Sequence, residues 1–347
     1  MNKTRINYFD NLRGILIILV LIGHFGGDNT SFSSVENIVL QTVECFIYLF
    51  HMPLMFFISG LFSKNVEKCR KNAFFDLFLP YLFFQIFYSI VQVLINKDET
   101  YIFNPFWTAP ALWYILALFV FRYVIKDILR IKGNLLIAFL LSLFGICLTG
   151  LSHDFAMDRI FANLLYFLLG YYFEPQTIID YKSKIYKNFI RKIIFYICAI
   201  VLSLLAFSFL YYLLYTEKLT FANLLGLIGR SKNVHEVGIR LLYGPLIALL
   251  GIISSIVFSI IVMVLTPEKK SWLTVVGQDT LPLYLSHMLI QLLYYKIQRR
   301  FFFFDNWYLN YGLSFIPVMI CVYVFSTHWY RSAFHKMLSL LKKVLVK

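Results

Sequence analysis

The chain of 347 residues is 60% hydrophobic and 14% charged, and its mean hydropathy is +0.73. These values exclude an ordinary soluble domain, whose surface needs far more polar and charged residues. The formal net charge of +14 does not indicate a nucleic-acid partner, because the basic residues fall between apolar runs, where positive-inside bias and anionic lipid account for them. We expect an all-α polytopic membrane protein that contacts membrane lipids and binds no nucleic acid.

Ten apolar runs follow one another along the chain. A bilayer core about 30 Å thick needs about 20 apolar residues per helix. The connections are too short to form a soluble domain, so residues 1–347 are predicted to be one integral-membrane domain. The predicted spans cover residues 11–27, 39–62, 74–95, 110–129, 134–151, 160–174, 190–215, 241–265, 272–295 and 308–330.

The distribution of lysine and arginine predicts the orientation. If the N-terminus is cytoplasmic, about two thirds of the 32 basic residues lie in inner segments. Both termini are therefore expected in the cytoplasm, with the chain crossing the plasma membrane several times.

The first span, "NYFDNLRGILIILVLIGHFGG" at residues 7–27, carries Arg13 near one end and His24 near the other. A separation of eleven residues is about 20° from three full helical turns and about 16 Å along the axis. One helix face thus links the two sides of the membrane. The alternative is that Arg13 snorkels to the inner headgroups and that His24 lies at the outer interface.

The second span contains "FHMPLMFFISGLF" at residues 50–62. His51 lies deep in the apolar run, and Pro53 frees a backbone carbonyl and kinks the helix. Ser59 with Gly60 allows a neighbouring helix to approach closely.

Glu44 precedes His51 by seven residues, which places both on one face of a continuous helix. Its expected depth is similar to that of His24. A carboxylate beside an imidazole can fix the tautomer and raise the basicity, as a general base requires. The alternative is a polar side chain at the outer interface.

The span at residues 272–295 contains "GQDTLPLYLSH". Gly277 and Pro282 predict an irregular helix, which is tolerated at membrane depth only beside protein or a water-filled cavity. His287 shares a helix face with Tyr284. Three histidines in interrupted spans indicate one polar cavity, although a scattered set of packing histidines stays open.

The acceptor side is less clear from the sequence. Trp113 is predicted near the outer boundary, where it either forms a sugar platform or belongs to an interfacial aromatic belt. The outer segment 216–240 contains "GRSKNVHEVG", and its charged residues either line a sugar site or face water.

Four motifs together resemble the membrane acyltransferase 3 family. They are the Arg13 and His24 pair, "FHMPLMFFISG", "LWYI" at residues 112–115, and the pattern G-x-x-T-L-P-x-Y-x-x-H ending at His287. The phrase "FHMP" is most similar to the fucose 4-O-acetylase-like polysaccharide O-acetyltransferases. The motifs extend over residues 8–287, which is most of the chain.

The resemblance implies an enzyme that moves an acetyl group from cytoplasmic acetyl-CoA to a hydroxyl of a glycan or lipid-linked sugar beyond the outer face. It assigns His24 as general base or transient acyl carrier and Arg13 as the donor contact, and we expect Glu44 to assist the base. Acetyl-CoA acts as a substrate, with no tightly bound cofactor, and the five cysteines have no metal-ligand spacing. A succinyl donor is the open alternative. The expected cavity residues are His51, Ser59, Trp113, Tyr284 and His287.

The inner loop before the third span is the expected site for the polyanionic coenzyme. Some related families have Arg, two residues, Arg in this loop, whereas "KCRK" places Lys68 and Lys71 at that spacing. The two lysines retain the positive charge, but they lack the planar guanidinium group with which arginine binds a phosphate through two hydrogen bonds. The predicted coenzyme-binding residues are Lys64, Lys68, Arg70 and Lys71.

Two other functional classes share part of this sequence pattern. A transporter that exports or flips a glycan or small anion also has broken helices and central ionisable residues, but the chain shows no internal repeat. A structural or sensing subunit would leave the buried charges without a use, at about 2.5 to 3.5 kcal/mol each.

Overall fold

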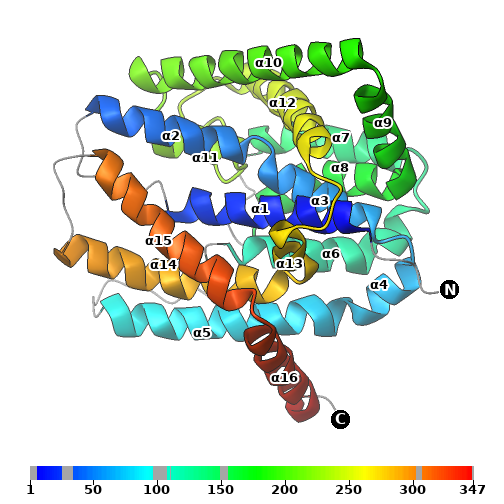
Figure 1. Ribbon diagram of the computed structural model, residues 1–347, viewed down its shortest axis with the longest axis vertical. Helices are drawn as coiled ribbons and strands as arrows, with labels where there is room; N and C mark the ends of the chain where they lie inside the picture. Colours follow the sequence, from blue (N-terminus) through cyan, green and yellow to red (C-terminus); the bar gives the residue numbers. More distant parts are fainter. Residues whose placement is uncertain are drawn as a thin grey trace.

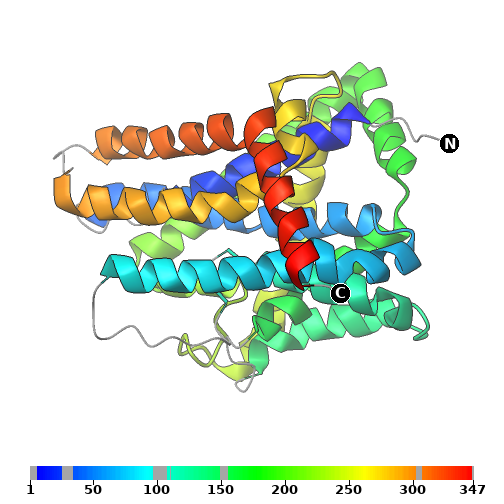
Figure 2. The same cartoon turned by 90° about the horizontal axis from the view of Figure 1, so that it is seen from below.

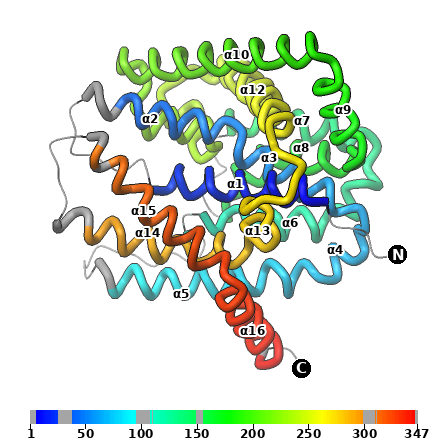
Figure 3. The backbone as a smooth tube through the Cα atoms, in the orientation of Figure 1, coloured from blue at the N-terminus to red at the C-terminus, as the bar shows by residue number. Residues whose placement is uncertain are grey.

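The computed structural model describes residues 6–25, 34–96, 108–109, 111–148, 155–301 and 307–345. Every regular element in these ranges is a helix, as expected. In Figure 1, α1 (Asn7–Phe25) runs through the middle of the bundle, and most other long helices lie roughly parallel or antiparallel to it. The smooth trace in Figure 3 shows how the chain returns repeatedly between the two ends of the bundle.

The first half of the chain contributes eight α-helices. A π-helical turn at Phe74–Phe78 joins α4 to α5, and a 3₁₀ turn at Gly145–Cys147 follows α7. After α1 the helices are α2 (Ser34–Tyr48), α3 (His51–Leu61), α4 (Val66–Ala73), α5 (Leu79–Asn96), α6 (Trp113–Ile128), α7 (Asn134–Phe144) and α8 (Met157–Tyr172).

The second half contributes another eight. A 3₁₀ turn at Leu241–Tyr243 precedes α12. The helices are α9 (Pro175–Lys187), α10 (Phe189–Tyr215), α11 (Phe221–Ile228), α12 (Gly244–Leu265), α13 (Trp272–Gln278), α14 (Leu281–Phe301), α15 (Trp307–Phe325) and α16 (His328–Leu345).

Five helical stretches among the described residues are long and apolar enough to cross a membrane, or six if the α15 and α16 pair is one span. That pair is bent by 71°, so α16 turns away from the bundle, as Figures 1 and 2 show. The other predicted spans correspond to shorter or more polar helices, and ten crossings stay a prediction. The stretches are Asn7–Phe25, Ile38–Leu61, Val66–Leu94, Phe189–Tyr215 and Leu241–Leu265.

Several predicted boundaries were wrong. The span expected at 272–295 is two helices, because α13 ends at Gln278 and α14 begins at Leu281. The span expected at 308–330 ends at Phe325. The segment 216–240, which was predicted to lie outside, contains α11 (Phe221–Ile228). Gly277 and Pro282 did predict the break between α13 and α14, since glycine weakens a helix and proline favours the first turn of a helix.

The break between α2 and α3 confirms the expected effect of Pro53. Proline has no N–H to donate to the carbonyl four residues earlier, which is that of Leu49. Ser255 of α12 donates its hydroxyl to this carbonyl at 2.5 Å. A buried polar group that the proline releases is thus satisfied by a neighbouring helix.

Glycines set the closest helix contacts. A Cβ on Gly60 of α3 would overlap the carbonyl of Phe167 of α8, and one on Gly170 of α8 would overlap that of Phe57 of α3. The expected close approach at Gly60 is therefore confirmed. Gly277 of α13 is in the same way placed directly against the Asp10 carbonyl of α1.

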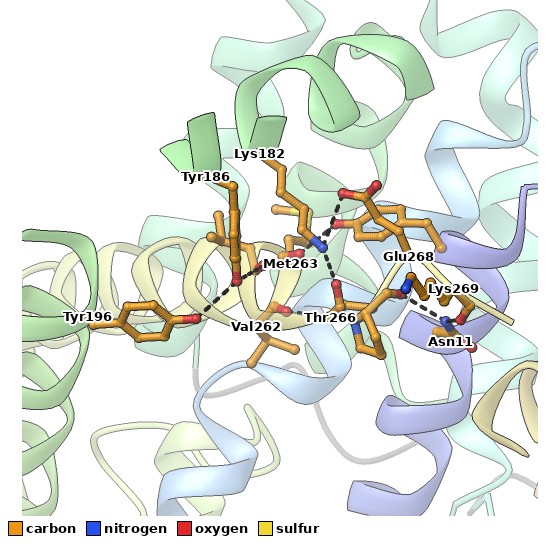
Figure 4. Close-up of polar contacts among 12 residues, drawn as sticks. Asn11, Lys182, Tyr186, Tyr196, Val262, Met263, Thr266, Glu268 and Lys269 are labelled. Carbon is orange, nitrogen blue, oxygen red and sulfur yellow. Dashed lines mark hydrogen bonds and ion pairs between the residues drawn. The ribbon is translucent and has the colours of Figure 1, made fainter. Parts of the chain in front are cut away.

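Two polar residues fix the end of the bundle where the N-terminus and α9 lie, which we call the N-end (Figure 1). Asn11 is fully buried, and its amide donates to the carbonyls of Pro267 and Lys269, both at 2.8 Å. Lys182 of α9 donates to the Thr266 carbonyl and lies 3.5 Å from Glu268 (Figure 4). Burial lowers the pKa of Lys182, whereas the Glu268 carboxylate acts in the opposite direction.

We expect Gly60→Val to destabilise the bundle, because the new side chain would force α3 away from α8. Overpacking of this kind costs about 1–3 kcal/mol or more, so the melting temperature in detergent should fall by about 4 °C or more. Gly145→Ala is the matched control, since a Cβ there meets open space. Equal melting temperatures for the two variants would contradict the close contact.

Candidate active site

The last turn of α1 is held by one face of α14. The His24 carbonyl accepts hydrogen bonds from the Gln291 amide at 2.8 Å and the Tyr295 hydroxyl at 2.5 Å. Gln291 and Tyr295 follow His287 at positions i+4 and i+8, so all three lie on the same side of α14. This packing fixes the position of His24 relative to His287.

The His24 and His287 rings form a close pair, with their centroids 5.2 Å apart. His287 is fully buried, and its Nδ1 donates to the Tyr284 carbonyl at 2.6 Å. A carbonyl can only accept, so Nδ1 carries the proton and Nε2 is the acceptor in the neutral ring. Among the residues that the structure describes, this buried Nε2 has no hydrogen-bond partner.

His51 is the third histidine of the group. Its Nδ1 donates to the Ile47 carbonyl at 2.8 Å, and its ring packs on Tyr48 with centroids 4.8 Å apart. His51 and His287 both lie within electrostatic range of His24. The helices α1, α3 and α14 therefore bring the three histidines together, but of the three only His24 lines the cavity described next. Of the five predicted cavity residues, Trp113 is in its lining, whereas His51, Ser59, Tyr284 and His287 are not.

A cavity of about 950 Å³ opens beside this group. His24, Tyr48 and Trp113 line it together with Arg159 of α8. The Arg159 guanidinium lies 4.8 Å from the centre of the Trp113 ring, which is a cation–π distance. Trp113 thus faces the cavity and holds a cation there.

Arg159, Tyr48 and Gln291 were not singled out from the sequence. Arg159 precedes the predicted span 160–174 by one residue, whereas α8 begins at Met157 and includes it in its first turn. The i, i+4 spacing from His287 was the signal that would have found Gln291.

Glu44 lies in α2, is 8% exposed, and is within electrostatic range of Tyr48 and Tyr311. The turn count that placed Glu44 and His51 on one face does not apply, because α2 ends at Tyr48 and a new helix begins at His51. Assistance of His24 by Glu44 stays a prediction.

Arg13 lies toward the N-end of the same helix α1. Its guanidinium is 3.6 Å from the Asp10 carboxylate and 4.7 Å from the centre of the Phe62 ring. Ser59 and Tyr114 share a hydrogen bond of 2.9 Å. Tyr284 donates its hydroxyl to the Ala111 carbonyl, which ties α14 to the start of α6.

The four expected coenzyme-binding residues differ in their surroundings. Lys64 donates to the Tyr171 and Phe173 carbonyls and pairs with Glu174 at 3.1 Å. Arg70 pairs with Asp127 at 2.9 Å. Lys68 and Lys71 are exposed. Two of the four therefore have structural partners, and two are directly accessible to a ligand.

A half-buried imidazole beside a second neutral imidazole and a cation can take a proton from a hydroxyl and stabilise a developing negative charge. The arrangement therefore suits acyl transfer to a hydroxyl. Comparison of the chain with known protein families agrees with this chemistry, since a family model described as an acyltransferase domain matches residues 6–327. No curated protein and no solved structure matches the chain.

We expect His287→Phe to lower the rate of acyl transfer about 10²-fold or more with little loss of stability, because phenylalanine fills the space but lacks Nε2. The measurement is the initial rate at saturating donor, together with the melting temperature. His328→Phe serves as the control, since His328 is exposed at the start of α16. Equal rates for the two variants would remove His287 from the site.

Proposed function

We propose, from the premise that the chain belongs to the membrane acyltransferase 3 family, that it moves an acetyl group from cytoplasmic acetyl-CoA to a hydroxyl of an extracytoplasmic glycan. The observation that carries this proposal is His24, which lines the 950 Å³ cavity and packs its ring against that of the buried His287. A cavity of this size is large enough for one or two sugar units. The N-end of the bundle is then cytoplasmic, in agreement with its many basic residues.

His24 acts as the general base in this proposal. A sugar hydroxyl is a poor nucleophile at neutral pH, and an imidazole with an ordinary pKa near 6.5 is suited to remove its proton. The hydroxyl oxygen forms a bond to the thioester carbonyl carbon, the carbon–sulfur bond breaks, and the proton passes through His24 to the departing thiolate. Arg159 lines the same cavity and favours negative charge there.

Arg13 belongs to the donor side. It lies about 16 Å from His24 along α1, toward the N-end. Ser59 of α3 and Tyr114 at the start of α6 supply hydroxyl groups. We place the acyl arm of the coenzyme along this route, with the anionic part of the molecule at the exposed Lys68 and Lys71.

A glycan exporter is the second candidate, because α2 with α3 and α13 with α14 are broken helices of the kind that transporters use. An exporter needs no thioester and releases no free coenzyme A. The two functions therefore differ in a measurable product.

The first experiment measures release of coenzyme A from radiolabelled acetyl-CoA by the purified protein, with and without a cell-surface glycan extract. We expect glycan-dependent release by the wild type, and a loss of about 10²-fold or more in His24→Ala. Arg13→Ala should raise the KM for acetyl-CoA. His235→Ala is the control, since His235 is exposed in the segment after α11.

The result that would contradict the proposal is an absence of release with every glycan tested. If the protein then moved glycan into liposomes, and the His24→Ala variant did so equally well, the result would support the exporter function instead of the acyltransferase function.

A second prediction concerns the donor site. Lys68→Ser combined with Lys71→Ser should raise the KM for acetyl-CoA about fivefold at low salt, and the effect should shrink as salt rises, because exposed charges are screened. Lys184→Ser with Lys187→Ser is the matched control, since both are exposed lysines of α9 at the same end of the bundle. Equal effects of the two pairs would indicate general surface charge instead of a donor site.

A further inference from the structure

The last helix, α16, runs across the direction of the bundle. It is bent by 71° from α15, and Figures 1 and 2 both show it crossing the long helices instead of following them. Helices that span a membrane lie near the membrane normal, so α16 lies close to the membrane plane. A helix in that plane binds the membrane surface when one of its faces is apolar and exposed.

The start of α16 is fixed near the N-end of the bundle. Arg331 donates through Nη2 to the Val275 carbonyl of α13 at 2.7 Å. The exposed connection that leads into α13 carries Lys269 and Lys270, and Asn11 of the N-end donates to its backbone. Only the short helix α13 therefore separates the start of α16 from the polar boundary of the N-end.

One side of α16 packs against α5. Phe334 is buried and stacks on Phe84 of α5, with ring centroids 5.9 Å apart. Two turns later, the Lys342 ammonium lies 4.5 Å from the centre of the Phe75 ring, in the turn before α5. These contacts determine which sides of α16 face outward.

An outward side of α16 is apolar. Trp329 is 75% exposed, Leu340 is 52% exposed and Val344 is 81% exposed. At about 100° per residue, these three and the exposed Ala333 lie within about 60° of one another around the helix axis. We call Trp329, Ala333, Leu340 and Val344 the apolar stripe. Apolar side chains arranged in this way are the part of an interfacial helix that lies among acyl chains.

Two lysines border the apolar stripe. Lys336 and Lys343 are exposed and lie about 20° and 40° from Trp329, on the side away from Val344. Long lysine side chains reach the headgroups while neighbouring apolar residues stay in the acyl chains. The sequence of α16 contains no acidic residue. This combination of charge and apolar surface fits anionic phospholipid, to which each lysine near the surface adds about fivefold in binding.

The first turns of α16 also contact the segment that carries His287. The hydroxyls of Tyr330 and Ser286 share a hydrogen bond of 2.5 Å, and Ser286 directly precedes His287. His335 Nε2 lies 2.6 Å from the Asp279 carboxylate, in the break between α13 and α14. The position of α16 therefore bears on the geometry of this break.

We propose that α16 binds the membrane surface at the N-end, with the apolar stripe among acyl chains and with Lys336 and Lys343 on anionic phospholipid headgroups. A helix held by lipid in this way braces the break between α13 and α14. The inference goes beyond the proposed function, because it makes lipid composition a determinant of the structure around His287.

The first test compares two neighbouring positions in nanodiscs that each hold one copy of the full chain. Leu340→Cys places a thiol on the apolar stripe, and Ser339→Cys places one about 100° away on an exposed polar side. A charged maleimide is added, and modification of each thiol is followed by peptide mass spectrometry. In phosphatidylcholine with phosphatidylglycerol, we expect the Leu340→Cys thiol to react at least about tenfold more slowly, because a charged reagent enters acyl chains poorly.

The lysines are tested in the same assay. Lys336→Gln with Lys343→Gln should reduce the protection of the Leu340→Cys thiol about fivefold or more, and phosphatidylcholine alone should have the same effect on the chain with both lysines. Lys184→Gln with Lys187→Gln is the matched control, since both are exposed lysines of α9 at the N-end, and it should leave the protection unchanged.

Hydrogen–deuterium exchange measures the bracing of the break. With phosphatidylglycerol present, the amides of residues 275–287 should exchange more slowly in the wild type than in Lys336→Gln with Lys343→Gln, because a braced segment opens less often. The control pair in α9 should exchange as the wild type does.

Four results would overturn the inference. Equal reactivity of the Leu340→Cys and Ser339→Cys thiols would show that lipid does not cover the apolar stripe. Protection that appears only in nanodiscs with two copies would identify the stripe as an interface between copies. Protection that is equal with and without phosphatidylglycerol would remove the role of the two lysines, and equal exchange at residues 275–287 would remove the bracing. None of these measurements uses acyl transfer, so each outcome leaves the proposed function unchanged.

Discussion

The structure depends on one constraint, which is that backbone carbonyls exposed inside an apolar bundle must receive hydrogen bonds. The helix break before Pro53 exposes the Leu49 carbonyl, and Ser255 donates to it. The end of α1 exposes the His24 carbonyl, and two side chains of α14 donate to it. Each of these hydrogen bonds joins helices far apart in the sequence, so the side chains that donate to the exposed carbonyls also determine which helices pack together.

Hydrogen bonds of the same kind hold the candidate active site in place. Because Gln291 and Tyr295 donate to the His24 carbonyl, the backbone of His24 cannot move away from α14 without breaking two hydrogen bonds. The Tyr284 hydroxyl in turn ties α14 to the Ala111 carbonyl, next to Trp113 of the cavity wall. Candidate site residues on α1, α6 and α14 are thus held in place by hydrogen bonds to backbone carbonyls, and acyl transfer needs positioning of this kind.

Much of this arrangement was predictable where a residue acts through local chemistry. Pro53 and Gly277 indicate helix breaks because each restricts or weakens a helix in a known way, and Gly60 indicates a close contact because only a residue without Cβ permits one. The grouping of His24, His51 and His287 followed from their position in interrupted apolar spans. These inferences need only the neighbours of each residue along the chain.

The features that the sequence did not predict depend on the exact ends of helices and on the three-dimensional positions of residues far apart in the chain. Glu44 and His51 were counted along one helix, but α2 ends at Tyr48 and α3 begins at His51, so a turn count does not carry across the break. Arg159 lies at the edge of a predicted span, where a shift of three residues moves it from a loop to a helix. The positive φ of Arg230, and its buried Nη1 without a partner among the described residues, likewise cannot be predicted from the neighbouring sequence.

The positions of the cations suggest why donor and acceptor can be handled by one small bundle. Arg159 lines the same cavity as His24, whereas Arg13 lies on the same helix as His24 but toward the N-end. A cation in an apolar interior costs free energy unless negative charge comes near it, and in the proposed reaction the coenzyme carries phosphate and the attacked carbonyl develops negative charge. The coenzyme would therefore be drawn toward the N-end, and Arg159 would favour the charge that develops near His24. The separation of charge along the interior would then keep the coenzyme and the acceptor on opposite sides until the acyl group passes.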